Sequence, residues 1–228
     1  MIIQGLQKLT LLDYPEKMAC TVFTPGCNFK CPFCHNASLV RGDGDSISEQ
    51  EFFKFLNTRK NILEGVCITG GEPTLQPDLP EFIRKIKDMG FLVKLDTNGY
   101  RPDVLKALVK DGLLDYVAMD IKNSKSKYAL TAGIDEFNIE KIIESVDFLI
   151  NGDLDFEFRT TVVKEFHDEK DILDIAEWIR GAKKYYLQKF VDSEDLICPD
   201  CTGYENSDME KLVNRIRGGF EEASGRGF

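Results

Sequence analysis

The sequence predicts an α/β fold built around a largely parallel sheet that is open or curled towards a barrel. Short apolar segments, rich in β-branched and aromatic residues, alternate with amphipathic segments of helical period along most of the 228 residues. Six such β-α units in succession favour parallel strands joined by right-handed crossovers. The whole pattern fits a single domain with a substantial core.

The predicted strands alternate with the predicted helices. The strands cover residues 19–24, 65–69, 91–95, 116–119, 156–163 and 184–190. Ligands of parallel α/β folds bind where the strands end at their carboxyl edge. Residues that directly follow each strand are therefore the first candidates for a functional site.

Helix signals fill the intervals between these strands. Ser48 and Glu51 form a capping box ahead of the first long helix. A second helix is predicted by the apolar stripe Leu79, Phe82, Ile83, Ile86 and Met89, which ends at Gly90. A third is predicted by the shorter stripe Leu105, Leu108 and Val109, before Gly112. Helices are also expected over 139–150 and 172–180, whereas the glycine-rich residues 218–228 are expected to be frayed.

Charge and composition exclude several classes of function. The chain has 29 Lys and Arg against 39 Asp and Glu, a net charge of −10, and no basic run that would favour binding to nucleic acid. It has neither a leader-like start nor an apolar run of about 18 residues, so we expect a cytoplasmic protein without a membrane partner. In a reducing compartment, its seven cysteines are more often thiols or metal ligands than disulfides.

The densest chemistry follows the first predicted strand, where Cys27, Cys31 and Cys34 lie within eight residues. Gly26 and Pro32 keep this segment a loop, so that the thiolates can converge. An ordinary iron–sulfur cubane takes four thiolates. Three would leave one iron open to a ligand that is not part of the protein.

Other interpretations of the cysteines compete. The pattern Cys31-x-x-Cys34-His35 matches covalent haem attachment, but such attachment goes with export, and Cys27 stays unexplained. A structural zinc site could be completed by His35 or by the distant pair Cys198 and Cys201. Incidental core cysteines are disfavoured by the tight loop; within strands, however, Cys20 and Cys67 are expected to be core residues.

Polar residues also follow the next three strands. Gly70, Gly71 and Glu72 offer close backbone approach and an acceptor for a cationic amine. Two further strand exits carry Asp96-Thr-Asn98-Gly and Asp120-Ile-Lys122. Each motif alone is commonly a turn or a cap, but four neighbouring strand exits with ligand-type residues indicate one site. His167, before a later helix, is expected to have a capping or surface role.

The cysteine spacing resembles the signature of the radical S-adenosylmethionine (SAM) enzymes. The resemblance continues through 13–17, 70–73, 96–99, 119–122 and 158–163 and covers roughly residues 5–190. Within that superfamily the chain resembles the glycyl-radical-enzyme activases, most of all the activating protein of anaerobic ribonucleoside-triphosphate reductase. This resemblance implies a partial (β/α)6 barrel in a core domain, 1–190. Residues 191–228 would form a C-terminal extension with the Cys198–Cys201 pair and a flexible tail.

The resemblance also implies the cofactors and their ligands. Cys27, Cys31 and Cys34 would be the catalytic ligands of a [4Fe–4S] cluster whose fourth iron takes SAM. The residues expected to line the cofactor site are Gly70, Gly71, Glu72, Asp96, Asn98, Asp120, Lys122 and Arg159. A monovalent cation is expected at the two aspartates, and Arg159 is expected to lie towards the substrate.

The implied reaction installs a glycyl radical on a partner enzyme, and a flavodoxin or ferredoxin is the expected electron donor. Little room after Cys34 for a ferredoxin-like insert favours a ribonucleotide reductase or pyruvate formate-lyase type of activase. Two alternatives stay open: a radical SAM enzyme that acts on a small molecule, and a zinc-stabilised binding domain without catalysis.

Overall fold

The computed structural model of the protein describes residues 1–228 except 43, 193–195 and 199. The chain divides into two compact units, and each is described by itself. The N-terminal unit comprises Met1–Asn28, Ser38–Thr97 and Arg101–Val117. The C-terminal unit comprises Phe29–Ala37, Asn98–Tyr100 and Ala118–Phe228. The predicted boundary near residue 190 does not coincide with this division, and a core domain that ends there stays a prediction.

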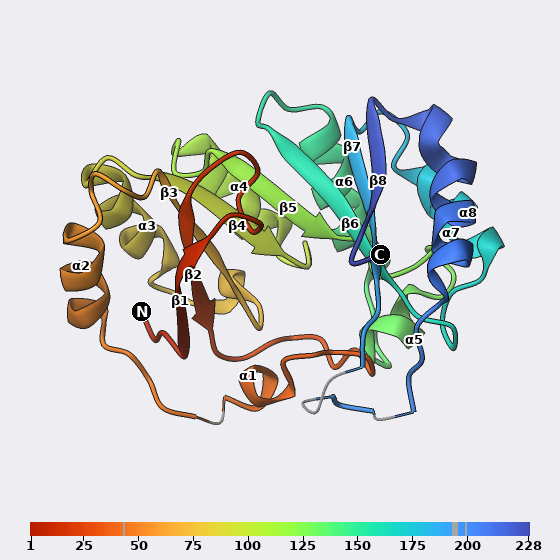
Figure 1. The fold of residues 1–228 in the computed structure, drawn as a ribbon, viewed down its shortest axis with the longest axis horizontal. Helices are drawn as coiled ribbons and strands as arrows, with labels where there is room; N and C mark the ends of the chain where they lie inside the picture. The colour runs from red at the N-terminus through yellow and green to blue at the C-terminus, as the bar shows by residue number, and fades with distance from the viewer. Residues whose placement is uncertain (43, 193–195, 199) are drawn as a thin grey trace. The chain divides into compact units, whose positions relative to one another are not determined.

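The described residues form eight strands whose order in the sheet is their order along the chain (Figure 1). β1 and β2 are antiparallel, whereas β2–β3, β3–β4, β6–β7 and β7–β8 are parallel. This open, mainly parallel order confirms the predicted α/β class and partial barrel. The strands are β1 Gly5–Thr10, β2 Ala19–Thr24, β3 Gly65–Gly70, β4 Leu92–Thr97, β5 Tyr116–Asp120, β6 Phe156–Val162, β7 Lys184–Lys189 and β8 Glu222–Arg226.

Helices separate most of these strands. They are α1 Ala37–Arg41, α2 Glu49–Asn57, α3 Leu79–Asp88, α4 Pro102–Lys110, α5 Tyr128–Ala132, α6 Ile139–Ile150, α7 Glu169–Trp178 and α8 Asn206–Ile216, with 3-10 turns η1 Pro73–Leu75 and η2 Arg217–Gly219. The predicted capping box at Ser48 and Glu51 is present at the start of α2. No helix that the structure describes is long and apolar enough to cross a membrane.

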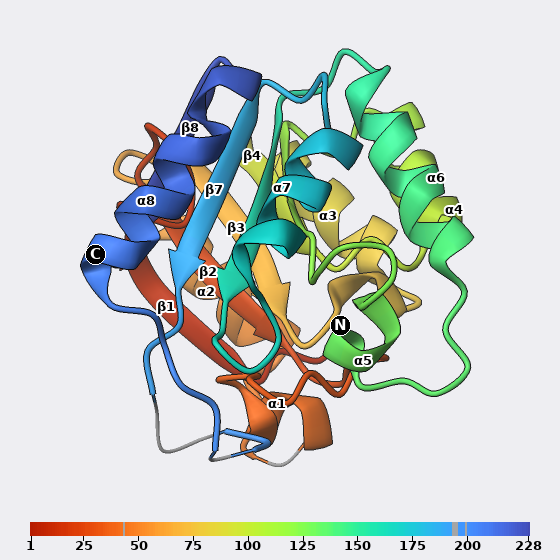
Figure 2. The same cartoon turned by 90° about the vertical axis from the view of Figure 1, so that its right-hand side faces the viewer.

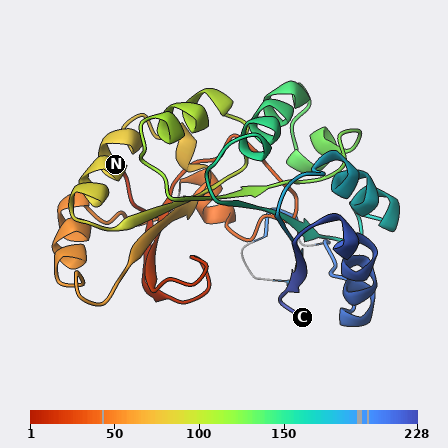
Figure 3. The ribbon, with the colours of Figure 1, turned by 90° about the horizontal axis from the view of Figure 1, so that it is seen from above.

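In the N-terminal unit, helices cover the strands with the apolar stripes that the sequence predicts. The face of α3 formed by Leu79, Phe82, Ile83 and Ile86 is buried. Figure 3 shows α3 and α4 along one side of β3 and β4. Gly90 follows the end of α3 with a φ of +91°, as expected for a residue that closes a helix. The hydrophobic effect therefore fixes these helices on the sheet while the strand ends stay available for polar residues.

In the C-terminal unit, α8 packs beside α7 and against β7 and β8 (Figure 2). The expectation of a frayed end over 218–228 is wrong, because Glu222–Arg226 forms β8 in parallel register with β7. Arg226 binds both carboxylate oxygens of Glu157, at 2.7 and 2.9 Å, and lies 3.6 Å from the ring centroid of Tyr186. Pairing with a neighbouring strand thus overrides a local sequence with poor strand propensity.

Candidate functional site

In the N-terminal unit, the start of the cysteine loop lies directly beside the Gly-Gly-Glu motif. β2 and β3 end in register at Thr24 and Gly70. The Gly71 amide donates to the Thr24 carbonyl at 2.8 Å, and the Glu72 amide donates to the Gly26 carbonyl at 2.8 Å. Two motifs that are more than forty residues apart in the sequence are thereby joined at one edge of the sheet, as parallel strands predict.

The two glycines are required by this contact between backbones. Gly70 has a φ of +123°, and a Cβ built there would lie 2.2 Å from the Thr24 nitrogen. A Cβ on Gly71 would lie 2.0 Å from the Gly26 oxygen. The sequence analysis expected the backbone of these glycines to lie close to a ligand. In the structure, that backbone lies close to the start of the cysteine loop instead. Binding of SAM by these glycines stays a prediction.

Glu72 is 1 % exposed, and two threonines hold its carboxylate. Its Oε1 accepts from the Thr74 amide at 3.0 Å and from the Thr97 hydroxyl at 2.8 Å, and also from the Thr74 hydroxyl. These bonds fix the orientation of the carboxylate. Thr97 lies in the predicted Asp-Thr-Asn-Gly motif, but its role as an orienting donor was not visible in the sequence.

Asp96, at the end of β4, forms an ion pair with Lys94. Both side chains point to the same face of the strand because they are two residues apart. Lys94 is 1 % exposed, and the predicted core residue Cys67 is indeed buried beside this pair. The sequence identified the aspartate but missed the lysine, because a lysine in a strand is ordinarily solvated.

Asn98 belongs to the C-terminal unit, where its side chain makes a turn. Its Oδ1 accepts from the Tyr100 amide at 3.0 Å. Gly99 has a φ of +74°, a Cβ there would lie 2.1 Å from Cε of Met119, and its carbonyl accepts from the Ser145 hydroxyl at 2.6 Å. The structure therefore gives Asn98 a conformational role, and contact with a cofactor stays a prediction.

Aromatic packing and main-chain bonds hold the rest of the cysteine loop in the C-terminal unit. The Lys30 amide donates to the Ala132 carbonyl at 2.9 Å, and the Cys34 amide donates to the Cys31 carbonyl at 3.0 Å. Phe33 packs against Phe166 and His167, with ring centroids 5.8 and 6.3 Å apart. The Cys31–Cys34 segment is thus a defined turn.

A charged cluster faces this turn. The Asp120 carboxylate binds the Lys122 ammonium at 3.0 Å and the Arg159 guanidinium at 3.0 Å. Burial alone would raise the pKa of Asp120, but the charges of Arg159 and Lys122 outweigh burial and lower that pKa to about 2. The predicted site residues Asp120, Lys122 and Arg159 therefore lie together, and each of them is charged.

Cys31 is buried next to this cluster. Burial raises the pKa of its thiol to about 11, while the positive charge of Lys122 opposes that rise. A metal ligand must be the thiolate. The position of Lys122 hence favours the charged form of Cys31 that a ligand requires.

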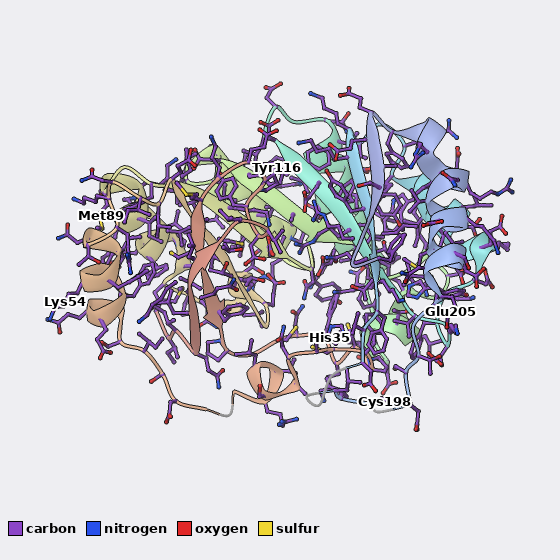
Figure 4. All side chains as sticks on the ribbon, in the orientation of Figure 1. His35, Lys54, Met89, Tyr116, Cys198 and Glu205 are labelled. Atoms are coloured by element: carbon purple, nitrogen blue, oxygen red, sulfur yellow. The ribbon has the colours of Figure 1, made fainter. Side chains whose placement is uncertain are left out.

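The Cys198–Cys201 pair lies beside the same turn. The Cys198 amide donates to the Pro32 carbonyl at 2.8 Å, between Cys31 and Cys34 in the sequence. His35 stacks on Phe190 with centroids 5.0 Å apart, and its Nε2 lies 2.7 Å from the Val191 carbonyl oxygen. Figure 4 labels His35 and Cys198 in this region. Phe190, Val191 and Cys198 therefore support the cysteine loop.

His167 is buried, so the expected surface role is wrong. It is 2 % exposed, its Nδ1 accepts from the Val163 amide at 3.2 Å, and its Nε2 lies 2.8 Å from the Lys122 carbonyl oxygen. This arrangement places the proton on Nε2. The ring therefore links Val163, which directly follows β6, to Lys122, two residues after β5.

The donor set matches the chemistry of an iron–sulfur cluster. Cys27 belongs to the N-terminal unit, whereas Cys31 and Cys34 belong to the C-terminal unit. Across the described part of the chain, no three His, Cys, Asp or Glu side chains are gathered as in a metal-ion site. Thiolates are nevertheless the ligands that such clusters take, and three of them on one loop fit a cluster with one open iron.

Comparison with known proteins gives the family. A family model described as the radical SAM superfamily matches residues 21–179. A candidate glycyl-radical enzyme activating enzyme of Methanocaldococcus jannaschii is 37 % identical over 193 residues, which are 83 % of this chain and 80 % of the relative. A second such protein of that organism is 30 % identical, over 78 % of this chain and 68 % of the relative.

Solved structures show the same fold at low identity. SuiB of Streptococcus suis, bound to SAM, has a TM-score of 0.72 and 15 % identity; the match covers 91 % of this chain and 52 % of SuiB, so the chain spans about half of that protein. QueE of Escherichia coli has a TM-score of 0.54 and 14 % identity, over 99 % of this chain and 91 % of QueE. The family model and the relatives together establish that the chain belongs to the radical SAM superfamily.

Proposed function

We propose that this chain is a glycyl-radical-enzyme activase whose [4Fe–4S] cluster is held by Cys27, Cys31 and Cys34. The observation that carries this proposal is the 37 % identity over 80 % of a relative that is named as an activating enzyme. Membership in the superfamily implies the cluster and SAM as cofactors. The cysteine turn beside Lys122 and the Gly-Gly-Glu motif beside the loop start support this ligand set.

Cys27, Cys31 and Cys34 would hold the cluster. Together with SAM, the cluster would supply one-electron reductive cleavage of the sulfonium and removal of a hydrogen atom from the α-carbon of a glycine. The protein's own residues bind and orient. Glu72, held by Thr74 and Thr97, accepts the methionyl ammonium, and the backbone at Gly70 and Gly71 lies alongside.

The C-terminal unit carries a charged cluster of its own, which also enters this proposal. Lys122 and Arg159 hold Asp120 ionised, and in this proposal their positive charges attract the anionic groups of SAM and of the substrate loop. Asn98 holds the turn that follows β4. The carboxylates of Asp96 and Asp120, where a monovalent cation was predicted, already pair with ammonium and guanidinium groups of the chain.

Anaerobic ribonucleoside-triphosphate reductase is the proposed partner, flavodoxin or ferredoxin the proposed electron donor, and the cytoplasm the proposed location. A pyruvate formate-lyase type of partner is the nearest alternative. A small-molecule substrate is the second candidate, because relatives named as GTP 3′,8-cyclases match at 32 % identity. That match covers only 41 % of those proteins.

One set of measurements decides among these functions. The protein is purified and reconstituted without oxygen, analysed for iron, sulfide and zinc, then reduced and given SAM. Formation of 5′-deoxyadenosine supports the radical reaction, and a glycyl EPR signal after addition of the reductase identifies the substrate. 5′-Deoxyadenosine without any glycyl signal favours a small molecule, whereas a zinc-loaded protein without 5′-deoxyadenosine supports the binding domain.

Replacing Cys31 with Ala is expected to abolish both retention of the cluster and cleavage of SAM, because a thiolate ligand is lost. Iron and sulfide content and 5′-deoxyadenosine yield are the measurements. Cys20→Ala is the matched control, since Cys20 is also buried but lies within β2. Full activity of the Cys31 variant contradicts the ligand assignment.

A further inference from the structure

Strand β4 carries a lysine, Lys94, that is almost completely buried. Lys94 is 1 % exposed and pairs with Asp96, whose side chain is 13 % exposed. Its Nζ also lies 3.9 Å from the sulfur of Cys67, the residue opposite it on β3. The Lys94 ammonium is thus enclosed within the sheet, where it pairs with the carboxylate of Asp96.

A buried lysine needs a reason beyond packing. Moving an ammonium out of water is costly, and an apolar residue of similar volume would usually stabilise the strand at least as well. A buried carboxylate, in turn, must be paired with a cation or must coordinate one. Lys94 satisfies that need of Asp96 from within the chain.

Asp120, the other aspartate at which a cation was predicted, is also paired with cationic side chains. Asp120 binds Lys122 and Arg159, each at 3.0 Å. Both carboxylates at which a monovalent cation was predicted therefore have cationic side chains as partners. The positive charge that the site requires is part of the fold.

We propose that Lys94 is a built-in counter-cation. Its ammonium takes the place of a bound Na⁺ or K⁺ at Asp96 and makes the binding of SAM independent of these ions. Lys94 is a positioning residue, because it acts through the carboxylate that it orients. The inference rests on the proposed function, in which Asp96 faces the cofactor.

The other lysine–aspartate pair next to β4 shows why Lys94 differs from an ordinary ion pair. Lys87 binds Asp115 near the start of that strand, at 2.6 Å, and both side chains are 26 % exposed. Water can replace either partner there. This pair has similar chemistry and lies in the same unit, so it provides a matched control.

The test is the equilibrium binding of SAM to anaerobically reconstituted enzyme with an oxidised cluster, so that no turnover occurs. Binding is compared in choline chloride, NaCl and KCl at equal ionic strength. The dissociation constant of the unaltered protein is expected to change by less than about twofold. Lys94→Met is expected to bind at least about tenfold more weakly in choline and to recover in Na⁺ or K⁺, whereas Lys87→Met behaves as the unaltered protein.

Two results overturn the proposal: unaltered enzyme that needs Na⁺ or K⁺ to bind SAM, or a Lys94→Met variant with unchanged affinity in all three salts. Because loss of one partner of a buried pair can prevent folding, Lys94→Met/Asp96→Asn is measured too. This neutral variant is expected to be insensitive to the ions, and a gain of affinity in K⁺ contradicts the proposal. If unaltered enzyme neither binds SAM nor forms 5′-deoxyadenosine in any salt, the proposed function itself fails.

Discussion

Individual side chains of the candidate site are held by partners that are distant in the sequence. Glu72 depends on Thr97, 25 residues later, and Asp120 depends on Arg159, 39 residues later. The acids themselves are recognisable in the sequence because they follow strands. Their hydrogen-bond donors are not recognisable, because threonine and arginine occur widely on strands for other reasons.

Thr97→Val tests this dependence at one residue. It keeps the shape of the side chain and removes the hydroxyl that donates to Glu72. A hydrogen bond to a charged group is worth about 1.5–3 kcal/mol, so the dissociation constant of SAM is expected to rise by roughly tenfold or more. Thr21→Val, which removes a similar bond to Asp13, is the control and is expected to leave SAM binding unchanged.

A single residue, His167, is also expected to make the stability of the protein depend on pH. Burial lowers the pKa of His167 from 6.5, although its bonds to Lys122 and Val163 oppose this. Below pH 6.5 the unfolded chain binds a proton that the folded protein resists, so the contribution to stability is complete above that pH and is lost as the pH falls towards the lowered pKa.

The free energy of unfolding of the unaltered protein should therefore decline below pH 6.5, by at most about 1.4 kcal/mol per pH unit from this residue. Urea titrations between pH 7.5 and 5 measure it. His167→Gln, which cannot take up that proton, is expected to show a flatter profile over this range. Parallel profiles for the two proteins would contradict the role given to His167.

Among the elements, the exits of β2 and β3 are in direct backbone contact at Gly70 and Gly71. Gly71→Ala would place a methyl group 2.0 Å from the Gly26 carbonyl oxygen. Overpacking of this kind costs about 1–3 kcal/mol. We expect a loss of that size in urea unfolding, together with weaker retention of the cluster because the Cys27 loop is displaced. Gly218→Ala, where no atom lies within 4 Å, should change stability by less than about 0.5 kcal/mol.

The ion pair between Arg226 of β8 and Glu157 is expected to stabilise the protein. Arg226→Met leaves the carboxylate of Glu157 buried at 1 % exposure without its bidentate partner. Removing one partner of a buried pair costs about 3–5 kcal/mol, and the 33 % exposure of Arg226 places the expected loss near the lower limit. Arg180→Met, in a surface pair with Glu177, is the control and should have almost no effect on the melting temperature.

For the whole molecule, the sequence was sufficient for the class of fold. Each of the six predicted strands is present, and their ends differ by at most two residues. β1 and β8 were not predicted, since Gly5–Thr10 and Glu222–Arg226 contain few residues with strong strand propensity. Both lie at the ends of the strand order, where pairing with one neighbour decides whether a strand forms.

By itself, the sequence determined the alternation of strands and helices, the superfamily signature of Cys27, Cys31 and Cys34, and the acids at the strand exits. These are local properties, because periodicity and spacing are set by the backbone geometry of nearby residues. Only the tertiary structure decided that Lys94 neutralises Asp96, that His167 is buried, and that Cys198 binds the cysteine loop. Such pairings join residues from separate segments, and burial makes them favourable only after the chain has folded.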